Sequence, residues 1–148
     1  MSHDVEQPNQ VEHLIPDGWT RREFKGIPAS VEALWTRRDG DAWRYAVALD
    51  ERHENAQGYI HGGVLSTFAD HAMSLMVWEA SGRANCTTVQ MNSHFLSAIK
   101  APSFVEVDTT ITKRGRQMIF ARALLHVSGE PIMEVTGVWR VFAKEAKI

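Results

Sequence analysis

The chain has 148 residues, with 16 lysines and arginines against 18 aspartates and glutamates, a formal net charge of −2 and 44% hydrophobic residues. These values are close to those of average globular domains, and a chain of this length buries enough surface to fold around one core without disulfides or a structural metal. They exclude low-complexity, collagen-like and disulfide-scaffold proteins. The net charge also provides no field that would attract nucleic acid.

Residues 1–30 are predicted to form an N-terminal arm or capping segment, and residues 31–148 a single domain. The arm starts acidic, with no lysine or arginine before residue 21, which is the opposite of a signal peptide. A short helix is predicted over residues 11–15. No apolar run approaches the ~20 residues that span a bilayer, and the single cysteine, Cys86, fits a reducing compartment. We therefore expect a cytoplasmic protein that binds neither membranes nor nucleic acid.

Two strands are predicted next, over residues 34–37 and 43–49, joined by a hairpin turn at residues 38–41. Apolar residues alternate along the second strand, which predicts that one of its faces is buried. After Gly62 and Gly63 the apolar residues no longer alternate, and this predicts a helix of about 17 residues that ends near Gly82.

Long runs of β-branched and aromatic residues follow the helix and are separated by short turns. They predict four more strands, over residues 87–95, 104–113, 117–127 and 132–142. The predicted helix is apolar on most of its circumference and must therefore be buried. A curved antiparallel sheet, made of these four strands and one or two earlier ones and wrapped around the helix, achieves this. The expected fold class is α+β.

The polar positions of the predicted helix fall on one stripe, at spacings of three and four residues. The stripe contains Ser66, Thr67, Asp70, His71 and Ser74, and it lacks the lysines and arginines of a solvated helix face. This composition is typical of a cleft or of a surface that meets another protein. The simpler alternative is a polar seam between subunits in which Asp70 forms an ion pair.

The start of the helix offers a second candidate feature. Asn55 and His61 lie just upstream, and Gly62 and Gly63 leave the first backbone N–H groups open to a ligand. These groups, at the positive end of the helix dipole, can stabilise an oxyanion. Taken alone, paired glycines at a helix start are more often a packing or turn device.

Residues 55–63 follow the pattern N-x-x-G-x-x-H-G-G, and Asp70 and a Thr87-Thr88 strand follow them. This combination resembles the hotdog-fold thioesterases of the PaaI type, over about residues 33–142. The resemblance implies a curved antiparallel sheet wrapped around one long central helix. It also implies hydrolysis of an acyl thioester, usually of coenzyme A.

The resemblance assigns a role to each matching residue. The Gly62 amide polarises the thioester carbonyl with help from Asn55, and His61 orients the carbonyl or supports Asn55. Asp70 activates water or attacks the carbonyl, while the hydroxyl of Thr88 orients the water. Alternation along a strand places Thr88 on one face with Gln90 and Asn92, so Thr88 reaches the helix only if this whole polar face does.

The spacing of Gly62 and Asp70 bears on assembly. Eight residues correspond to about 12 Å along a helix, which is too far for both groups to touch one carbonyl. Two subunits with antiparallel helices would bring Gly62 of one to Asp70 of the other, giving two composite sites per dimer. The resemblance likewise implies a homodimer, often doubled to a tetramer.

Basic residues surround a glycine in the turn Lys113-Arg114-Gly115-Arg116. They suit the phosphates of coenzyme A, which the resemblance places in this region. A solvated hairpin is an almost equal alternative. Gly63 is a further candidate contact for the substrate.

No metal and no cofactor apart from the coenzyme A of the substrate are predicted. His53-Glu54 begins like a zinc motif, but Gln57 stands where the second histidine would be. The leading hypothesis is an acyl-CoA thioesterase for a short-chain, medium-chain or aromatic acyl group. A non-catalytic acyl-CoA binding or sensor protein is the alternative. A third hypothesis is a hotdog dehydratase, but the sequence lacks the histidine-containing segment of those enzymes.

Overall fold

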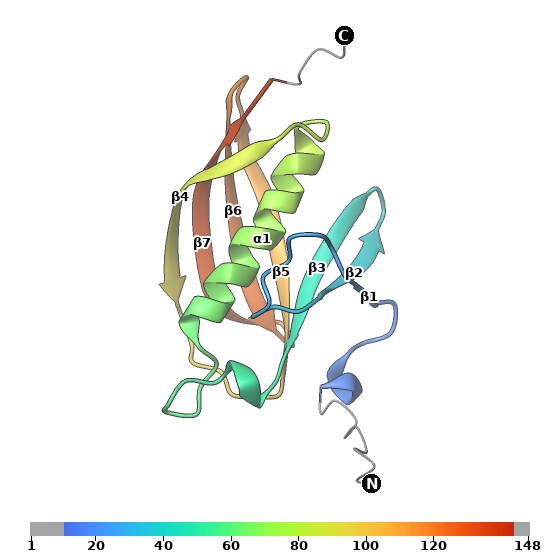
Figure 1. Ribbon diagram of the computed structural model, residues 1–148, viewed down its shortest axis with the longest axis vertical. Coiled ribbons are helices and arrows are strands. Elements are labelled where there is room, and N and C mark those ends of the chain that lie inside the picture. The colour runs from blue at the N-terminus through green and yellow to red at the C-terminus, as the bar shows by residue number, and fades with distance from the viewer. Residues whose placement is uncertain (1–10, 144–148) are drawn as a thin grey trace, which may run out of the picture.

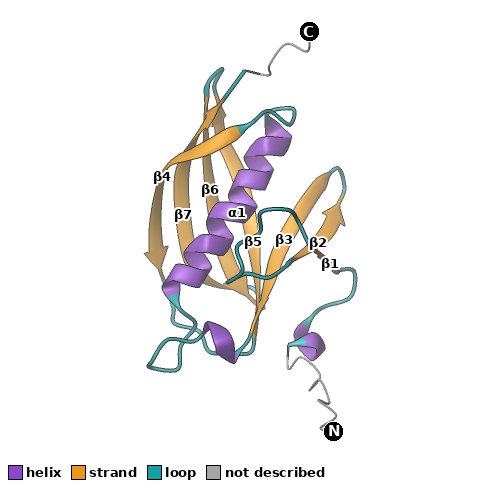
Figure 2. Cartoon of the chain, in the orientation of Figure 1, coloured by secondary structure: helices purple, strands orange, loops and turns teal. Residues whose placement is uncertain are grey.

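The computed structural model describes residues 11–143. A helix, α1 (Gly62–Ala80), lies against a seven-stranded antiparallel sheet with the order β1-β2-β3-β5-β6-β7-β4 (Figures 1 and 2). Two 3-10 helices, η1 (Glu12–Leu14) and η2 (Glu51–His53), accompany it. The strands are β1 (Thr20–Arg22), β2 (Leu34–Asp39), β3 (Ala42–Leu49), β4 (Cys86–Phe95), β5 (Ser103–Arg114), β6 (Met118–Val127) and β7 (Glu130–Val141). This is the hotdog fold, and the predicted fold class is confirmed.

Six of the strands lie within two residues of their predicted ranges. The sequence did not predict β1, because its three residues are all polar and exposed and show no alternation. Three strands therefore precede α1, where one or two were expected. The helix also begins at Gly62 and includes both glycines, which were expected to precede it.

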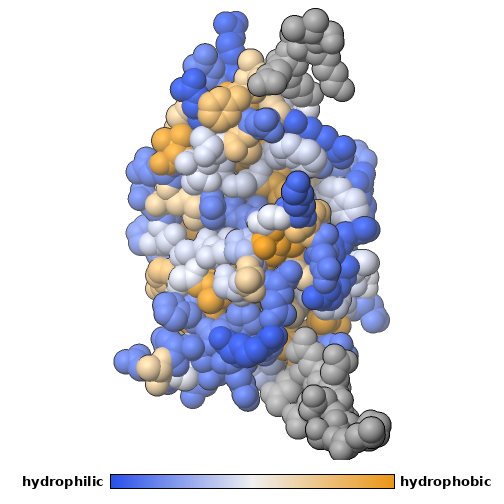
Figure 3. Space-filling view, viewed as in Figure 1, coloured by the Kyte–Doolittle hydropathy of each residue, from blue (hydrophilic) through white to orange (hydrophobic). Residues whose placement is uncertain are grey.

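The main core lies between α1 and the inner face of the sheet. Five residues of α1 are completely buried there: Phe68, Ala69, Ala72, Met73 and Val77. They meet equally buried residues of the central strands, Val47, Val105, Leu125 and Val135. Each large side chain buried in this way contributes about 1.5–3 kcal/mol, which fixes the side of α1 that faces the sheet. The face of the molecule on which α1 lies is mostly hydrophilic, with small hydrophobic patches scattered over it (Figure 3).

A second, smaller core covers the outer face of β3 and β5. Trp19 packs edge-on against Phe104, with ring centroids 5.3 Å apart, and Ala46 beneath them is completely buried. The predicted burial of one face of this strand is confirmed by Tyr45, Val47 and Leu49, and at Ala46 the opposite face is buried as well. The covering of this opposite face was not predicted, because the covering residues come from the N-terminal segment, which adds β1 to β2 at the sheet edge.

The hairpin of β2 and β3 diverges from the rest of the sheet. Pairing of β3 with β5 stops at Tyr45 and Val107, whereas β2 and β3 remain paired up to Asp39 and Ala42. Figure 1 shows the resulting gap between the hairpin and β5. Gly40, with φ of +61°, provides the left-handed conformation at the turn.

The sheet has two distinct ends, which matter for the site. Register places Cys86, Met118 and Arg114 at the end where α1 finishes, since they lie beside Val141, Arg140 and Ile119. Phe95, at the other end of β4, lies beside the start of α1. No helix within residues 11–143 is long and apolar enough to cross a membrane.

Candidate active site

Asp70 and Thr88 meet between α1 and β4. Oδ1 of Asp70 accepts a hydrogen bond of 2.6 Å from Oγ1 of Thr88, and both residues are half-buried. Oγ of Ser74, one helical turn after Asp70, lies 3.5 Å from each of these two atoms. The structure thus joins the carboxylate and the strand hydroxyl that the sequence singled out.

A β-bulge aims Thr88 at the helix. Thr88 lies opposite Trp139 and Gln90 opposite Val138, so Val89 is an extra residue in β4. The extra residue reverses the alternation, and Gln90 then lines a groove on the outer face of the sheet. The prediction that Thr88 shares a face with Gln90 and Asn92 was therefore wrong. Thr88 faces Asp70 without the rest of the polar strand doing so.

Trp139 supports this group from beneath. It is completely buried on β7, and its Nε1 donates a hydrogen bond of 2.9 Å to Oγ of Ser74. A buried indole N–H needs such a partner. Ser74 accepts this bond, which leaves its own proton to donate toward Asp70 or Thr88. Sequence reasoning placed Ser74 on the polar stripe but missed Trp139, because its partner lies 65 positions away in sequence.

The start of α1 leaves one backbone N–H free. His61 is the N-cap, and its Nδ1 accepts the N–H of Gly63 at 3.2 Å. The N–H of Gly62 has no hydrogen-bond partner within residues 11–143. The expectation that both glycine N–H groups are open holds for Gly62 alone. Because Nδ1 of His61 accepts, its neutral ring carries the proton on Nε2.

Asn55 holds a tight turn before the helix. Its Oδ1 accepts the N–H groups of Gln57 and Tyr59 at 2.9 and 3.2 Å. The side-chain oxygen is therefore occupied, whereas the Nδ2 group keeps two protons for a ligand. The N–H of His61 donates to the carbonyl of His53 at 2.8 Å, which ties this turn to η2.

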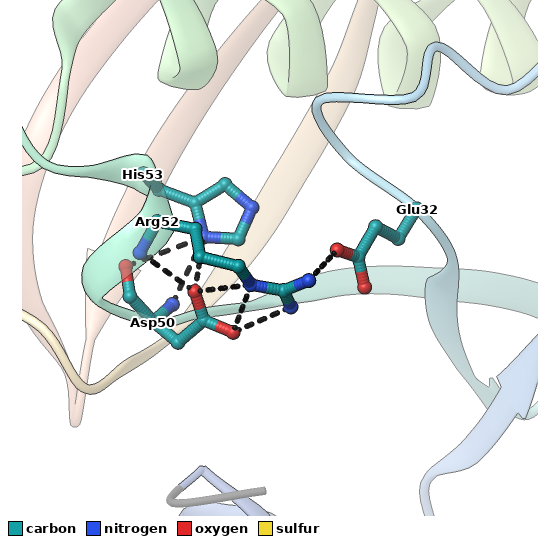
Figure 4. Close-up of polar contacts among 4 residues, drawn as sticks. All are labelled: Glu32, Asp50, Arg52 and His53. Carbon is teal, nitrogen blue, oxygen red and sulfur yellow. Dashed lines mark hydrogen bonds and ion pairs between the residues drawn. The ribbon is translucent and has the colours of Figure 1, made fainter.

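An ionic cluster anchors η2 from below (Figure 4). The guanidinium of Arg52 binds Asp50 at 2.6 Å and Glu32 at 2.7 Å. Hydrogen bonding to Arg52 holds the pKa of the Asp50 carboxyl below its usual value. The buried ring of His53 accepts the backbone N–H of Asp50 through Nδ1 at 3.0 Å. His53 is therefore part of this anchor, and residues 11–143 contain no cluster of three possible metal ligands.

His71 and Cys86 lie close to Asp70 without joining its hydrogen bonds. Nε2 of His71 is buried and has no partner in the described part of the chain. Burial lowers the pKa of His71, although the charge of Asp70 opposes this shift, so the ring is neutral at pH 7. Burial and Asp70 both raise the pKa of the Cys86 thiol, whose Sγ lies 3.9 Å from the Ser74 carbonyl. Burial therefore favours the neutral form of both groups.

The basic turn lies far from the start of the helix in the same chain. Lys113, Arg114 and Arg116 are exposed at the end of the sheet where α1 finishes, and none forms an ion pair with another described residue. Ten residues of β4 separate this end from Gly62, a distance of about 30 Å. Gly115 allows the tight turn, since a Cβ there would lie 2.7 Å from the carbonyl of Met118.

One chain therefore contains the predicted groups in three separate places. Asp70 and Thr88 lie together, the free N–H of Gly62 is eight residues earlier along α1, and the basic turn is at the opposite end of the sheet.

Comparisons with known proteins agree with this architecture. Residues 57–133 match the family described as Thioesterase superfamily. The chain is 32% identical over 97 residues to "Putative esterase PA0474" of Pseudomonas aeruginosa, covering 65% of this chain and 72% of that protein. It is 27% identical over 73 residues to acyl-coenzyme A thioesterase 13 of Mus musculus, spanning 49% of this chain and about half of that protein.

Solved structures share the fold. Thioesterase superfamily member 2 of zebra fish has a TM-score of 0.72 at 20% identity, covering 81% of this chain and 89% of that one. A hypothetical thioesterase from Streptococcus pneumoniae, solved with coenzyme A, has a TM-score of 0.71 at 18% identity and coverages of 80% and 92%. PaaI of E. coli has a TM-score of 0.62 at 14% identity, with coverages of 68% and 72%. The predicted resemblance is thereby confirmed, and the chain belongs to the thioesterase superfamily of hotdog-fold proteins.

Proposed function

We propose that the chain is an acyl-CoA thioesterase, which hydrolyses a short-chain, medium-chain or aromatic acyl-CoA to the free acid and coenzyme A. The observation that carries the proposal is the Asp70 carboxylate, held by a 2.6 Å hydrogen bond from Thr88 on the flank of α1 that faces β4. Membership of the thioesterase superfamily supports it. The curated relative from mouse carries an acyl-coenzyme A thioesterase name.

The active site is composite in this proposal and requires two subunits. β4 pairs with β7 on one side, and its other edge pairs with no strand of residues 11–143. This edge is long and carries exposed apolar side chains, with Val89 56% and Phe95 54% exposed. An edge of this kind is a ready template for another strand. Antiparallel pairing of β4 with its copy extends the sheet and brings the two helices side by side in opposite directions.

In such a dimer, the start of one α1 lies beside the middle of the other. The thioester carbonyl then accepts the N–H of Gly62 and an Nδ2–H of Asn55, and His61 orients it through Nε2–H. Asp70 of the partner takes a proton from water that Thr88 helps to hold, and the resulting hydroxide adds to the carbonyl. Alternatively, the carboxylate itself adds to the carbonyl and forms an anhydride, which water then hydrolyses to the free acid and Asp70. The C–S bond breaks and coenzyme A leaves as a thiolate, which is protonated by the solvent or the site.

The same dimer accounts for the position of the basic turn. Antiparallel pairing places the end of one sheet that carries Lys113, Arg114 and Arg116 next to the helix start of the other subunit. Their unpaired cations suit the phosphates of coenzyme A. Gly63 contributes backbone surface beside the carbonyl, since His61 occupies its N–H.

Further parts of the proposal concern the whole protein. The boundaries are an N-terminal cap over residues 1–30 and a thioesterase domain over residues 31–148, of which residues 1–10 and 144–148 lie outside the described part of the chain. The packing of Trp19 on Phe104 supports the cap. The dimer is expected to double to a tetramer. The single cysteine, Cys86, supports a cytoplasmic location.

The test is thiol release from a panel of acyl-CoA esters by the wild type and by Asp70→Asn. An amide is a poor base and a poor nucleophile, so kcat should fall by about 10²–10⁴-fold with the fold intact. Asp41→Asn, at an exposed carboxylate in the β2–β3 turn, is the matched control and should retain full turnover. Near wild-type hydrolysis by Asp70→Asn would contradict the catalytic assignment. Tight binding of acyl-CoA by the wild type without thiol release would favour a sensor.

A further inference from the structure

Two adjacent cavities, each of about 270 Å³, lie where the β2–β3 hairpin diverges from β5. Both are lined by Trp43 and Tyr45, and the one closer to the end of α1 is also lined by Phe24 and Trp78. We call this second one the aromatic cavity. It reaches Glu79, nine residues after Asp70, which corresponds to half a turn around the helix axis. The aromatic cavity therefore lies on the opposite flank of α1 from the proposed active site.

The lining of the aromatic cavity includes a hydroxyl donor on a largely buried side chain. Tyr45 is only 5% exposed, and its hydroxyl has no hydrogen-bond partner within residues 11–143. Burial, with a contribution from the charge of Glu79, raises the pKa of Tyr45 to about 12. The phenol is thus neutral at physiological pH and has a proton to donate. In the adjoining cavity, Oγ1 of Thr109 is likewise buried without a partner in the described part of the chain.

The charges at the rim are mostly positive. Glu79 forms an ion pair of 3.4 Å with Arg83, and Arg22 forms none with another described residue. The side chain of Arg22 makes a hydrogen bond of 3.4 Å to Thr36 inside the cavity. One cation at the mouth is therefore not neutralised, which favours an anionic ligand.

The aromatic rings are unsuited to a cationic ligand, because the protein already places cations over them. The guanidinium of Arg83 lies 5.1 Å from the ring centroid of Trp78, and that of Arg38 lies 5.0 Å from that of Trp43. The remaining ring surface offers apolar and stacking contacts to a flat or aliphatic body.

We propose that the aromatic cavity is a second ligand site, which binds a small free carboxylic acid with an aromatic or aliphatic body. The body lies against Trp43 and Trp78, and the carboxylate accepts the hydroxyl of Tyr45 and pairs with Arg22. The carbonyl of a thioester has no charge, so the free acid is the expected ligand rather than an acyl-CoA. This inference does not depend on the proposed activity at Asp70.

The experiment is isothermal titration calorimetry of the full chain with benzoate and hexanoate. Benzamide and benzylammonium are the neutral and cationic counterparts of benzoate, and both should bind more weakly. Arg22→Gln should raise the Kd of benzoate by at least about tenfold, as expected for a charged hydrogen bond. Arg21→Gln, at the neighbouring exposed arginine that pairs with Glu23, is the matched control and should leave the Kd unchanged.

Two more variants separate binding from folding. Tyr45→Phe removes a single hydroxyl and should weaken benzoate severalfold while leaving the Kd of benzamide less affected. Glu79→Gln removes the like charge beside the ligand and should strengthen benzoate binding, a gain that misfolding cannot produce. Asp70→Asn should leave the Kd unchanged.

The inference is overturned if none of the acids binds at millimolar concentration or if benzylammonium binds best. It is also overturned if Arg21→Gln weakens binding as much as Arg22→Gln does, or if Asp70→Asn abolishes binding, since the acid would then occupy the active site.

Discussion

Thr88 acts on Asp70 through one short hydrogen bond and supplies neither the base nor the electrophile of the proposed reaction. Loss of a neutral hydrogen bond costs about 0.5–1.5 kcal/mol. Thr88→Ala should therefore lower kcat by about two- to twelvefold, which is much less than Asp70→Asn. Thr88→Ser keeps the hydroxyl and should be nearly harmless. Steady-state kinetics of thiol release measure both, and an unchanged kcat for Thr88→Ala would place this residue outside the site.

Among the individual residues of the site, the sequence predicted some and missed others, and each omission has a physical reason. The Asp70–Thr88 pair followed from a recognised pattern and is present. Trp139 and its bond to Ser74 were not predicted, because a strand pattern does not state which helix residue a buried indole will reach. The occupation of the Gly63 N–H was missed because it depends on the rotamer of His61.

At the scale of elements, Gly137 couples β7 to the site. A Cβ on Gly137 would lie 2.5 Å from the ring of Trp139 and 3.0 Å from the carbonyl of Gln90. Gly137→Ala should therefore displace Trp139 and break its hydrogen bond to Ser74. We expect a destabilisation of about 1–3 kcal/mol, seen as a lower Tm, together with a reduced kcat although no proposed catalytic residue is changed.

The matching control is Gly137→Ala with Trp139→Phe. The smaller ring makes room for the methyl group but cannot donate to Ser74, so Tm should recover more than kcat does. A single variant Gly137→Ala with wild-type Tm and kcat would show that the indole has space to move.

The helices and strands could be predicted wherever the burial of one face produces a regular hydrophobic pattern in the sequence. Strands with one face on the core, such as β6, alternate between buried and exposed residues and were predicted to within two residues. β1 and the bulge at Val89 were not, because pairing at a sheet edge and an extra strand residue leave no hydrophobic pattern. The bulge matters most, since it decides which strand side chains face α1.

A further prediction concerns the basic residues of the β5–β6 turn. Arg114→Ala combined with Arg116→Ala should raise the KM of full coenzyme A esters much more than that of pantetheine esters, which lack the nucleotide phosphates. These side chains are exposed, so the difference should shrink at high salt. Equal changes in KM for both substrate types would assign the turn to a solvated hairpin.

At the scale of the whole molecule, a single chain cannot complete the proposed site. Gly62 and Asp70 are separated by about 12 Å along one helix, and the constant rise per residue of the helix fixes this distance. The free edge of β4 is the surface on which a second copy would supply the missing half.

Subunit mixing tests this arrangement directly. Asp70→Asn and Asn55→Ala are each expected to be nearly inactive as homodimers, since every site then lacks one group. A heterodimer of the two variants has one site with both defects and one site with neither. Mixing under conditions of subunit exchange should therefore restore up to about half of the wild-type activity per heterodimer, because intact sites form only across the interface.

Exchange is verified by mass spectrometry of differently tagged chains. The control is a mixture of Asp70→Asn with Thr88→Ala, because Asp70 and Thr88 of one chain meet in the same site. In that control each site keeps one defect, Asp70→Asn in one and Thr88→Ala in the other, so no intact site forms and the activity should not exceed the mean of the two parent homodimers. Proven exchange without recovery in the first mixture would mean that Asn55 and Asp70 serve one site within a single chain.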